Sequence, residues 1–403
     1  MASNLWGKVY FKNVYTGILT QQPGGRCVFT YDETYLNSGM PAIAFTLPLQ
    51  TEPHVYEDGL HPFFDNLGAE GWLKNAQSRA LGIKKNDRFA LLLAFGADLA
   101  GAVTIIDPVP VSGFSIDIDD PENFAALTAR ASLSGIQPKL GAIKDGRKFR
   151  SVKQGEQATH IAKLASGSLP DIIELEYLTM QASKALLKKD AVADVCIATL
   201  DGVTPKALLV KRFDRTENGK RLHFEEFNQL LGHKSEDKYD GCYEDMANFI
   251  LANGDICLKT ECDTLFRRIM ACILTGNTDA HFKNFAMMHT DAGLRLTPSY
   301  DLVASATYPD YQTLALGIEG SENLTLGNLR AKNIARLGSL FGLPDSAIML
   351  AVNDFEKSLP KARKNIDAAQ KIDQHIKGKL HQQMEKRWNG IFSSIGNYLL
   401  KKQ

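Results

Sequence analysis

Asp279-Ala-His-Phe-Lys-Asn284 is the stretch of this 403-residue chain that decides the fold. It follows an apolar helical run at residues 265–274, which would anchor a loop, and it places an aspartate five residues before an asparagine. Protein kinases use this spacing because one loop has to serve both the attacking hydroxyl and a metal ion. Two residues are a weak pattern by themselves, so the elements around them have to support the interpretation.

A predicted β-hairpin connects this loop to a second acidic residue. Residues 285–289 and 294–297 bracket Thr290-Asp-Ala-Gly293, and Asp301 follows the second strand. A kinase carries its second metal-binding aspartate at this place. The order of helix, loop, hairpin and aspartate therefore predicts Asp279 as a catalytic base, with Asn284 and Asp301 as ligands of Mg²⁺.

A kinase also needs a cation for the phosphates of ATP, and Lys163 is the candidate. It lies on a predicted strand at residues 159–164. A lysine that ends an edge strand is ordinarily solvated. The following helix at residues 171–187 offers Glu174 and Glu176, however, and a strand lysine paired with a helix glutamate is the kinase arrangement. Glu176 is the predicted partner, whereas Glu174 can be explained as a surface residue.

A loop upstream of this lysine, residues 131–140, has the composition to cover phosphates. It holds a single glycine, so it is neither the glycine-rich loop of ordinary kinases nor a Walker A motif, and by itself it could be a simple turn. Gly135 permits a close backbone approach, Gln137 offers an amide, and Lys139 adds positive charge.

Overall composition excludes several classes of protein. The 46 basic and 46 acidic residues cancel, so any contact with DNA has to be local or made through a partner. The most apolar run, residues 89–95, is too short to span a bilayer, and the amino terminus lacks the features of a secretory signal. Six cysteines without zinc-site spacing are expected to be buried or idle thiols. We therefore expect a cytoplasmic protein that has no membrane segment.

The order of predicted elements indicates an α+β fold of three regions. Residues 1–107 form a small α/β unit with strands at 9–11, 17–19 and 27–31 and helices at 63–67, 70–81 and 89–95. Residues 108–216 are rich in strands and contain a hairpin signal at Lys144-Asp-Gly-Arg147. Residues 217–403 are mostly helical. The last two regions resemble the lobes of a protein kinase, which predicts a two-lobed, protein-kinase-like fold with an additional N-terminal subdomain.

Five motifs of the chain form a specific combination: Ser132-Leu-Ser-Gly-Ile-Gln-Pro-Lys139, Thr159-His-Ile-Ala-Lys163, Val210-Lys-Arg-Phe-Asp-Arg215, Thr278-Asp-Ala-His-Phe-Lys-Asn-Phe285 and Thr297-Pro-Ser-Tyr-Asp-Leu302. With these motifs the chain resembles the HipA family of bacterial toxin kinases, in which they occur in the same order and at compatible separations. The N-terminal region is similar to the first subdomain of the family at Leu47-Pro-Leu-Gln50, Phe63-Phe-Asp-Asn-Leu67 and Gly101-Ala-Val-Thr-Ile105. The resemblance thus covers nearly the whole chain.

The resemblance implies a role for each motif. Asp279 matches the catalytic base, and Asn284 and Asp301 match the magnesium ligands. Lys163 matches the phosphate-binding lysine. The segment from Lys211 to Phe213 matches the hinge whose backbone meets adenine. The remaining implied ATP contacts are Ser134, Gly135, Gln137, Lys139, His281 and Tyr300.

The resemblance also implies a switch in the phosphate loop. Ser132 matches the family's autophosphorylation site, where a phosphate ejects the loop and silences the kinase. A phosphate adds about −1.5 to −2 charge, enough to disrupt a loop beside ATP. This chain has Ser-Leu-Ser where some members carry a small apolar residue in place of Ser134, so both serines are candidate phosphosites. Pro138 replaces an acidic residue of the best-known members and is expected to stiffen the loop.

The family further implies partners and targets. A HipB-like helix-turn-helix antitoxin is the expected partner, through which the complex would reach operator DNA. The expected target is a protein serine or threonine, with aminoacyl-tRNA synthetases such as glutamate-tRNA ligase as candidates. Two other functions stay open: a catalytically silent, kinase-fold corepressor, and a phosphotransferase that acts on small molecules.

Overall fold

The computed structural model describes residues 5–84, 86–108, 137–153 and 155–402. Its contacts divide the chain into two compact units: residues 1–166 with 196–237, and residues 167–195 with 238–403. Helix α6 (Ile172–Leu186) therefore groups with the second unit, although strands of the first unit flank it in sequence. The three-part division expected from the sequence places this helix in the middle region and stays a prediction.

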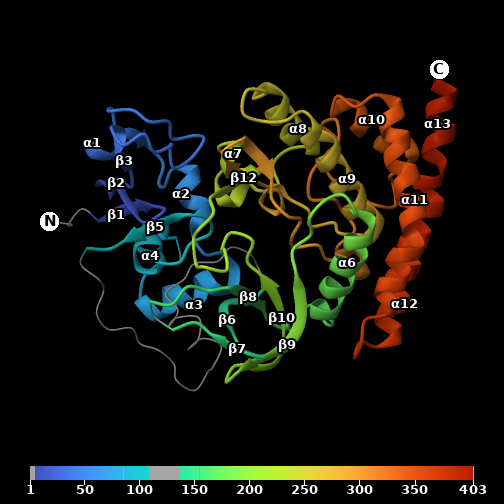
Figure 1. Ribbon diagram of the computed structural model, residues 1–403, viewed down its shortest axis with the longest axis horizontal. Helices are drawn as coiled ribbons and strands as arrows, with labels where there is room; N and C mark the ends of the chain where they lie inside the picture. The colour runs from blue at the N-terminus through green and yellow to red at the C-terminus, as the bar shows by residue number, and fades with distance from the viewer. Residues whose placement is uncertain (1–4, 85, 109–136, 154, 403) are drawn as a thin grey trace. The chain divides into compact units, whose positions relative to one another are not determined.

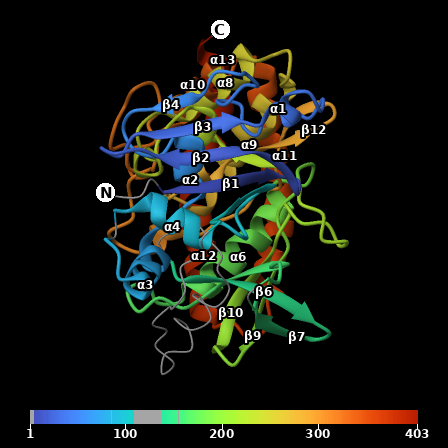
Figure 2. The same ribbon diagram turned by 90° about the vertical axis from the view of Figure 1, so that its left-hand side faces the viewer.

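The N-terminal part of the first unit is built on a five-stranded antiparallel sheet in the order β4-β3-β2-β1-β5. The strands are β1 (Trp6–Phe11), β2 (Val14–Gln21), β3 (Cys27–Tyr31), β4 (His54–Tyr56) and β5 (Val103–Ile106). Figure 2 shows β1 to β4 side by side. Alternate residues such as Val9, Phe11 and Phe29 are buried, as expected for a sheet with one face on the core. The predicted strands of this region are confirmed.

Helices complete this part: α1 (Glu33–Leu36), α2 (Pro62–Leu67), α3 (Gly71–Leu81) and α4 (Arg88–Phe95). The most apolar run of the chain thus becomes a short core helix, with Phe89, Leu92 and Leu93 buried against the sheet. Asp87 caps this helix, because its carboxylate accepts a hydrogen bond from the Ala90 N–H at 3.1 Å. The helices predicted from the sequence at 63–67, 70–81 and 89–95 are confirmed.

The remainder of the first unit is a closed barrel in the order β10-β8-β6-β7-β9. Its strands are β6 (Lys139–Asp145), β7 (Lys148–Ser151), β8 (His160–Lys163), β9 (Val195–Asp201) and β10 (Thr204–Lys211). The predicted Asp-Gly hairpin joins β6 to β7, with Gly146 at a φ of 60°. Leu73 of α3 belongs to the apolar core of the barrel, which explains why the N-terminal and strand-rich regions form one unit. Short elements β11 (Phe224–Glu226) and α7 (Phe227–Leu230) follow.

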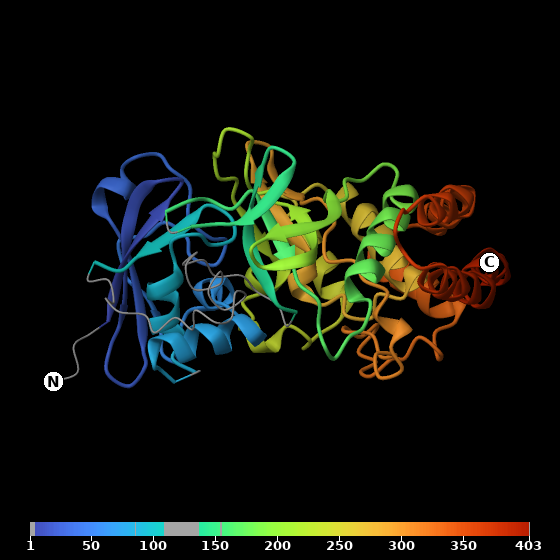
Figure 3. The same ribbon diagram turned by 90° about the horizontal axis from the view of Figure 1, so that it is seen from below.

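The second unit is largely helical, as predicted. Besides α6 it contains α8 (Tyr243–Ala252), α9 (Thr260–Thr275), α10 (Ala331–Leu340), α11 (Asp345–Asp367), α12 (Gln374–Gly390) and α13 (Ile395–Lys402). Helix α6 lies alongside the C-terminal helices α11 and α12, drawn green beside red in Figures 1 and 3. The predicted hairpin is formed by β12 (Ala286–Thr290) and β13 (Gly293–Leu296). Within the described residues, no helix combines the length and apolar character needed to cross a membrane.

Candidate active site

The loop that carries Asp279 begins where α9 ends. Gly276 caps the helix in the left-handed conformation, with a φ of 86°, which glycine adopts without strain. Its N–H donates a hydrogen bond to the Cys272 carbonyl at 2.8 Å. A Cβ at this position would lie 1.9 Å from the guanidinium of buried Arg387. The end of the helix, and therefore the start of the loop, is determined by backbone conformation and by close packing.

Thr278 anchors the loop just before the predicted base. Its backbone N–H donates to the Ser305 hydroxyl at 2.8 Å, and the two hydroxyls lie 2.7 Å apart. The Thr278 hydroxyl also donates to the Tyr311 carbonyl at 3.0 Å. Both side chains are buried, where unmade hydrogen bonds cost about 1–3 kcal/mol. Asp279 is thus attached to a rigid neighbour.

Asp279 itself is half-buried and is held by a tyrosine. The Tyr239 hydroxyl donates a hydrogen bond to Asp279 Oδ1 at 2.9 Å. The Asp279 backbone N–H donates to the Asn277 side-chain oxygen at 3.2 Å, and the His281 N–H donates to the Asp279 carbonyl at 2.9 Å. The ring of buried His281 meets the Tyr239 ring edge-on, with centroids 5.0 Å apart. Tyr239 therefore orients the carboxylate, whereas Asn277 and His281 hold the backbone of Asp279.

Asn284 and Asp301, the predicted magnesium ligands, lie in hydrogen-bond contact. The Asn284 amide nitrogen donates to Asp301 Oδ2 at 3.1 Å, and its amide oxygen accepts from the His281 N–H at 3.0 Å. Asp301 has a φ of 57°, a conformation that costs a non-glycine residue free energy and is concentrated at functional sites. Carboxylate and amide oxygens are the hard ligands that Mg²⁺ prefers. The donor set of these two side chains fits a magnesium ion.

The segment that leads to Asp301 is held by Arg268 of α9 and by residues 190–193, which follow α6 in the sequence. Arg268 of α9 pairs with Asp190 through two hydrogen bonds of 2.6 and 2.7 Å and also donates to the Thr297 carbonyl at 2.6 Å. Ser299 exchanges backbone hydrogen bonds with Ala191 and Ala193. Hydrogen bonds thereby fix Thr297 and Ser299, which lie just before Asp301.

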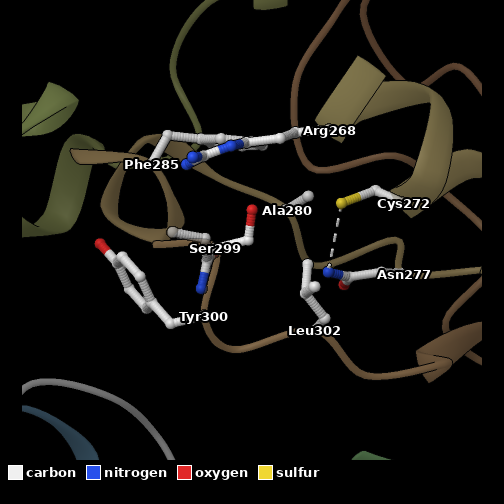
Figure 4. Close-up of a pocket in the computed structure, with 9 residues that line it drawn as sticks. Arg268, Cys272, Asn277, Ala280, Phe285, Ser299, Tyr300 and Leu302 are labelled. Atoms are coloured by element: carbon white, nitrogen blue, oxygen red, sulfur yellow. Dashed lines mark hydrogen bonds between the residues drawn. The ribbon is translucent and has the colours of Figure 1, made fainter. Parts of the chain in front are cut away.

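A small pocket lies behind the loop (Figure 4). Its lining residues come from α9, the loop and the segment before Leu302: Arg268, Cys272, Asn277, Ala280, Asn284, Phe285, Ser299, Tyr300 and Leu302. Figure 4 shows the Asn277 amide directed at Cys272, a contact of 3.6 Å between its nitrogen and Sγ. Burial raises the pKa of the Cys272 thiol to about 12, so this thiol stays protonated and serves as a structural group.

The prediction of buried thiols is confirmed for four of the six cysteines. All six are free thiols, and Cys27, Cys257, Cys262 and Cys272 are buried.

Tyr300, expected among the ATP contacts, donates its hydroxyl to the Lys283 carbonyl at 2.8 Å. In this arrangement its polar end supports the backbone of the predicted catalytic loop, residues 279–284.

In the first unit, Lys139 and Lys163 lie side by side on neighbouring strands of the barrel. They are directly opposed in the antiparallel pair of β6 and β8, so their side chains leave the same face of the sheet. Both are buried. This placement fits the predicted phosphate-binding role of both lysines.

Gln137 ties the end of the phosphate loop to the neighbouring strand. Its amide nitrogen donates to the Leu164 carbonyl at 2.7 Å, and the Leu164 N–H donates to the Pro138 carbonyl at 2.8 Å. The side-chain amide of Gln137, which was predicted to bind ATP, therefore uses one N–H to hold the end of the predicted phosphate loop beside Lys163.

The predicted hinge leaves β10 above a buried cluster of charges. Lys211 is exposed and Phe213 packs edge-on against Phe224 at 5.0 Å, whereas Arg212 between them points inward. Arg212 contacts Asp214 at 2.8 Å and Asp98 at 3.2 Å, both also buried. The inward charge of this segment therefore serves the fold, and the Arg212 backbone N–H donates to the Thr159 carbonyl at 3.0 Å. The contact of this segment with adenine stays a prediction.

The cluster extends to two more arginines. Arg215 lies 2.7 Å from Asp214 and 2.8 Å from Asp98, and Arg221 lies 3.5 Å from Asp98. The Gly101 N–H donates to Asp214 Oδ2 at 2.8 Å. The Asp98–Gly101 turn of the N-terminal region and the predicted hinge are thus joined through buried charges.

For several predicted site residues, the structure gives no position, contradicts the prediction or leaves it untested. Ser132, Ser134 and Gly135 lie outside the described residues. Glu174 and Glu176 are both buried on α6, so the explanation of Glu174 as a surface residue is wrong. Because Lys163 and Glu176 belong to different units, their pairing stays a prediction.

Sequence reasoning missed Tyr239 and Asp190. Neither lies in a recognisable motif, and nothing in their local sequence points to the loop they support.

Comparisons with known proteins identify the family of this chain. A family model of the HipA N-terminal domain matches residues 7–106, and one of the HipA-like C-terminal domain matches residues 131–375. Protein Y4dM of Sinorhizobium fredii is 30% identical over 79% of this chain and 80% of its own length. The serine/threonine-protein kinase toxin HipA of Shewanella oneidensis is 27% identical over 82% of each chain.

A solved structure shares the fold. A chain in the complex of Shewanella oneidensis HipA, HipB and operator DNA superposes with a TM-score of 0.73 at 23% identity, over 96% of this chain and 99% of that chain. This likeness confirms the predicted α+β, kinase-like fold.

Proposed function

Because the chain belongs to the HipA family, we propose that it is an ATP- and Mg²⁺-dependent serine/threonine protein kinase that acts as a toxin. One observation carries the proposal: the second unit gathers the half-buried carboxylate of Asp279 and the Asn284–Asp301 pair, 3.1 Å apart, in one polar loop cluster. A catalytically silent relative would be expected to lack one of these groups, and this chain has all three.

Each residue then has a chemical task. Asn284 and Asp301 would hold magnesium, which when bound neutralises charge on the phosphates of ATP. Lys163 and Lys139 balance the same charge from the barrel, and the backbone from Lys211 to Phe213 meets adenine. Asp279 orients a serine or threonine hydroxyl and accepts its proton as the oxygen attacks the γ-phosphorus and the bond to ADP breaks.

We extend the proposal to the regulation of this kinase. Ser132 and Ser134 are the proposed autophosphorylation sites, and a phosphate on either serine would repel the phosphates of ATP from the adjoining loop. The proposed target in the cell is a protein, with an aminoacyl-tRNA synthetase such as glutamate-tRNA ligase as candidate, so that phosphorylation would stop translation in the cytoplasm.

A HipB-like antitoxin is the proposed partner. Support comes from the solved complex of the related Shewanella protein, which contains HipB and operator DNA. The zero formal net charge of this chain fits a protein that reaches DNA mainly through such a partner.

The decisive experiment compares purified wild type with Asp279→Asn in ATP and MgCl₂, with mass spectrometry of the phosphorylated residues. We expect phosphate on Ser132 or Ser134 in the wild type only, and a loss of at least about 10³-fold in the variant. Asp291→Asn, at an exposed aspartate in the β12–β13 turn, is the matched control and should keep full activity. Phosphate on either serine of purified Asp279→Asn would contradict the proposal. Failure of nucleotide to raise the Tm of the wild type would favour the corepressor alternative.

A further inference from the structure

Tyr239 makes a contact that the kinase proposal does not yet use. Its hydroxyl donates to Oδ1 of Asp279 at 2.9 Å, although the two residues are 40 positions apart in the sequence. Tyr239 is 39% exposed, so burial alone does not explain its position. A large side chain that stays partly in solvent while its polar end reaches the predicted base calls for a chemical explanation.

The chain holds Tyr239 in place on both sides. On one side, the carbonyl of Lys238 accepts a hydrogen bond from the Phe282 N–H, within the catalytic loop, at 3.3 Å. On the other, the Gly241 carbonyl accepts from the Gly317 N–H at 2.9 Å. A Cβ on Gly241 would come within 2.8 Å of the Phe282 ring, so only glycine lets the backbone lie this close. Segment 238–241 is thus attached to the catalytic loop itself.

The surroundings also favour the phenol as a hydrogen-bond donor. The Lys238 ammonium lies 5.4 Å from the centroid of the Tyr239 ring, and the His281 ring meets the ring edge-on. A positive charge over an aromatic face is attracted to the ring and draws electron density from it, which strengthens the O–H as a donor. Hydrogen bonds to a charged acceptor are shorter and about twice as strong as neutral ones.

We propose that Tyr239 is a positioning residue for the catalytic base: its hydroxyl holds the Asp279 carboxylate in the orientation in which it receives the acceptor hydroxyl. This inference rests on the proposed function of Asp279. It follows the general pattern in which a base is oriented by a third group that does not touch the substrate. Since a carboxylate offers two oxygens and about four lone pairs, one phenol uses only part of its capacity and does not block the base.

The test is Tyr239→Phe, which removes one oxygen and keeps the ring against His281. Autophosphorylation is measured as a function of ATP concentration in MgCl₂, and nucleotide affinity is measured by calorimetry. We expect the maximal rate to fall about tenfold, as for loss of one hydrogen bond to a charged group, while the ATP concentration at half-maximal rate and the Tm stay unchanged. Tyr398→Phe is the matched control, because Tyr398 on α13 is 38% exposed, and it should behave as wild type.

The possible outcomes separate this inference from the kinase proposal. A wild-type rate in Tyr239→Phe would overturn the positioning role, and so would a faster rate, which would identify the phenol as a block on the base. A fall caused by weaker ATP binding or a lower Tm would also overturn it, because a merely structural role predicts those changes. If Asp279→Asn in the same assay retains activity, the kinase proposal itself fails.

Discussion

Charged residues have opposite roles in two regions of the molecule. One region is the buried charge cluster next to the predicted hinge, and the other is the predicted catalytic loop. In the first unit, Asp98, Asp214 and three arginines are removed from water and paired with one another. In the second unit, Asp279 stays half-buried, and its carboxylate accepts a hydrogen bond from the Tyr239 hydroxyl. A buried ion cluster is rigid because leaving any member unpaired is costly, whereas a base has to remain reachable. The first region serves the fold, and the second is available for chemistry.

The ionisation of the cluster follows from this difference. Burial by itself raises the pKa of Asp98 and Asp214, but Arg212 and Arg215 more than offset that effect and hold both carboxyl pKa values below their ordinary value. Burial and the neighbouring arginines lower the pKa of Arg221 to about 10. Three guanidinium groups face two carboxylates, so removing a negative charge should harm the cluster more than removing a positive one.

The largest expected effect on stability is that of Asp214→Asn. The change keeps the shape of the side chain but leaves three buried arginines facing one carboxylate, so the free energy of unfolding should fall by about 3–5 kcal/mol. Urea denaturation measures this. Asp201→Asn, at an exposed aspartate whose nearest cation is Lys148 at 3.7 Å, should change stability by less than about 1 kcal/mol. Equal effects at both positions would show that burial within the cluster does not make its charges more important for stability than a charge on the surface.

Gly276→Ala tests whether the catalytic loop depends on backbone geometry. The φ of 86° and the contact with Arg387 should together cost about 2–3 kcal/mol. Gly82→Ala is a matched control, since Gly82 also ends a helix with a positive φ of 63° but has open space, with nothing within 4 Å, where the Cβ of alanine would lie. It should cost only about 1 kcal/mol. Thermal unfolding of both variants isolates the effect of Arg387, and identical losses would show that this contact is unimportant.

A pH effect is expected from His61, which caps α2 in the first unit. Its Nδ1 accepts a hydrogen bond from the Phe63 N–H at 3.2 Å, which requires the neutral ring. Burial and nearby His54 lower the pKa of His61 from 6.5 to about 4. Because the unfolded chain binds the proton first, this stabilisation is complete above pH 6.5 and is lost as the pH falls towards about 4.

Between pH 7 and pH 5 the loss should be about 2 kcal/mol. His61→Asn keeps a cap but cannot titrate, so its urea midpoint should fall less over this pH range than that of the wild type. Parallel pH profiles for the two proteins would argue against His61 as the source.

Ser305→Ala should have the smallest effect. It removes the hydroxyl that binds the Thr278 N–H and side chain, which should cost about 1–2 kcal/mol and slow autophosphorylation several-fold as the loop loosens. Ser393→Ala removes an exposed hydroxyl that bonds only within its own turn, 3.2 Å from the Asn389 carbonyl, and serves as control. If Ser305→Ala leaves both stability and rate at the control level, the anchor at Thr278 is not needed.

Local sequence was sufficient for much of this structure. The Asp-Gly hairpin between β6 and β7, the hairpin after Asn284 and the helix before Asp279 all follow from turn chemistry and apolar periodicity over a few residues. The prediction did not name strands β4 and β9, which are short or partly exposed and become strands through pairing with β3 and β7. Whether a segment forms such a strand depends on its cross-strand neighbours, and local sequence does not predict which neighbours those are.

By itself, the sequence determined the spacing of Asp279, Asn284 and Asp301, because one loop and one hairpin separate these residues. Only the tertiary structure decided that Tyr239 reaches Asp279, that Asp190 holds Arg268, and that Asp98 pairs with Arg212 across 114 residues. Side chains so far apart carry no shared local pattern, and they meet because the burial of apolar surface brings their segments together. A charge buried without a partner costs free energy, so the charges that are brought into the interior are paired with one another. These contacts are therefore specific, although local sequence does not predict them.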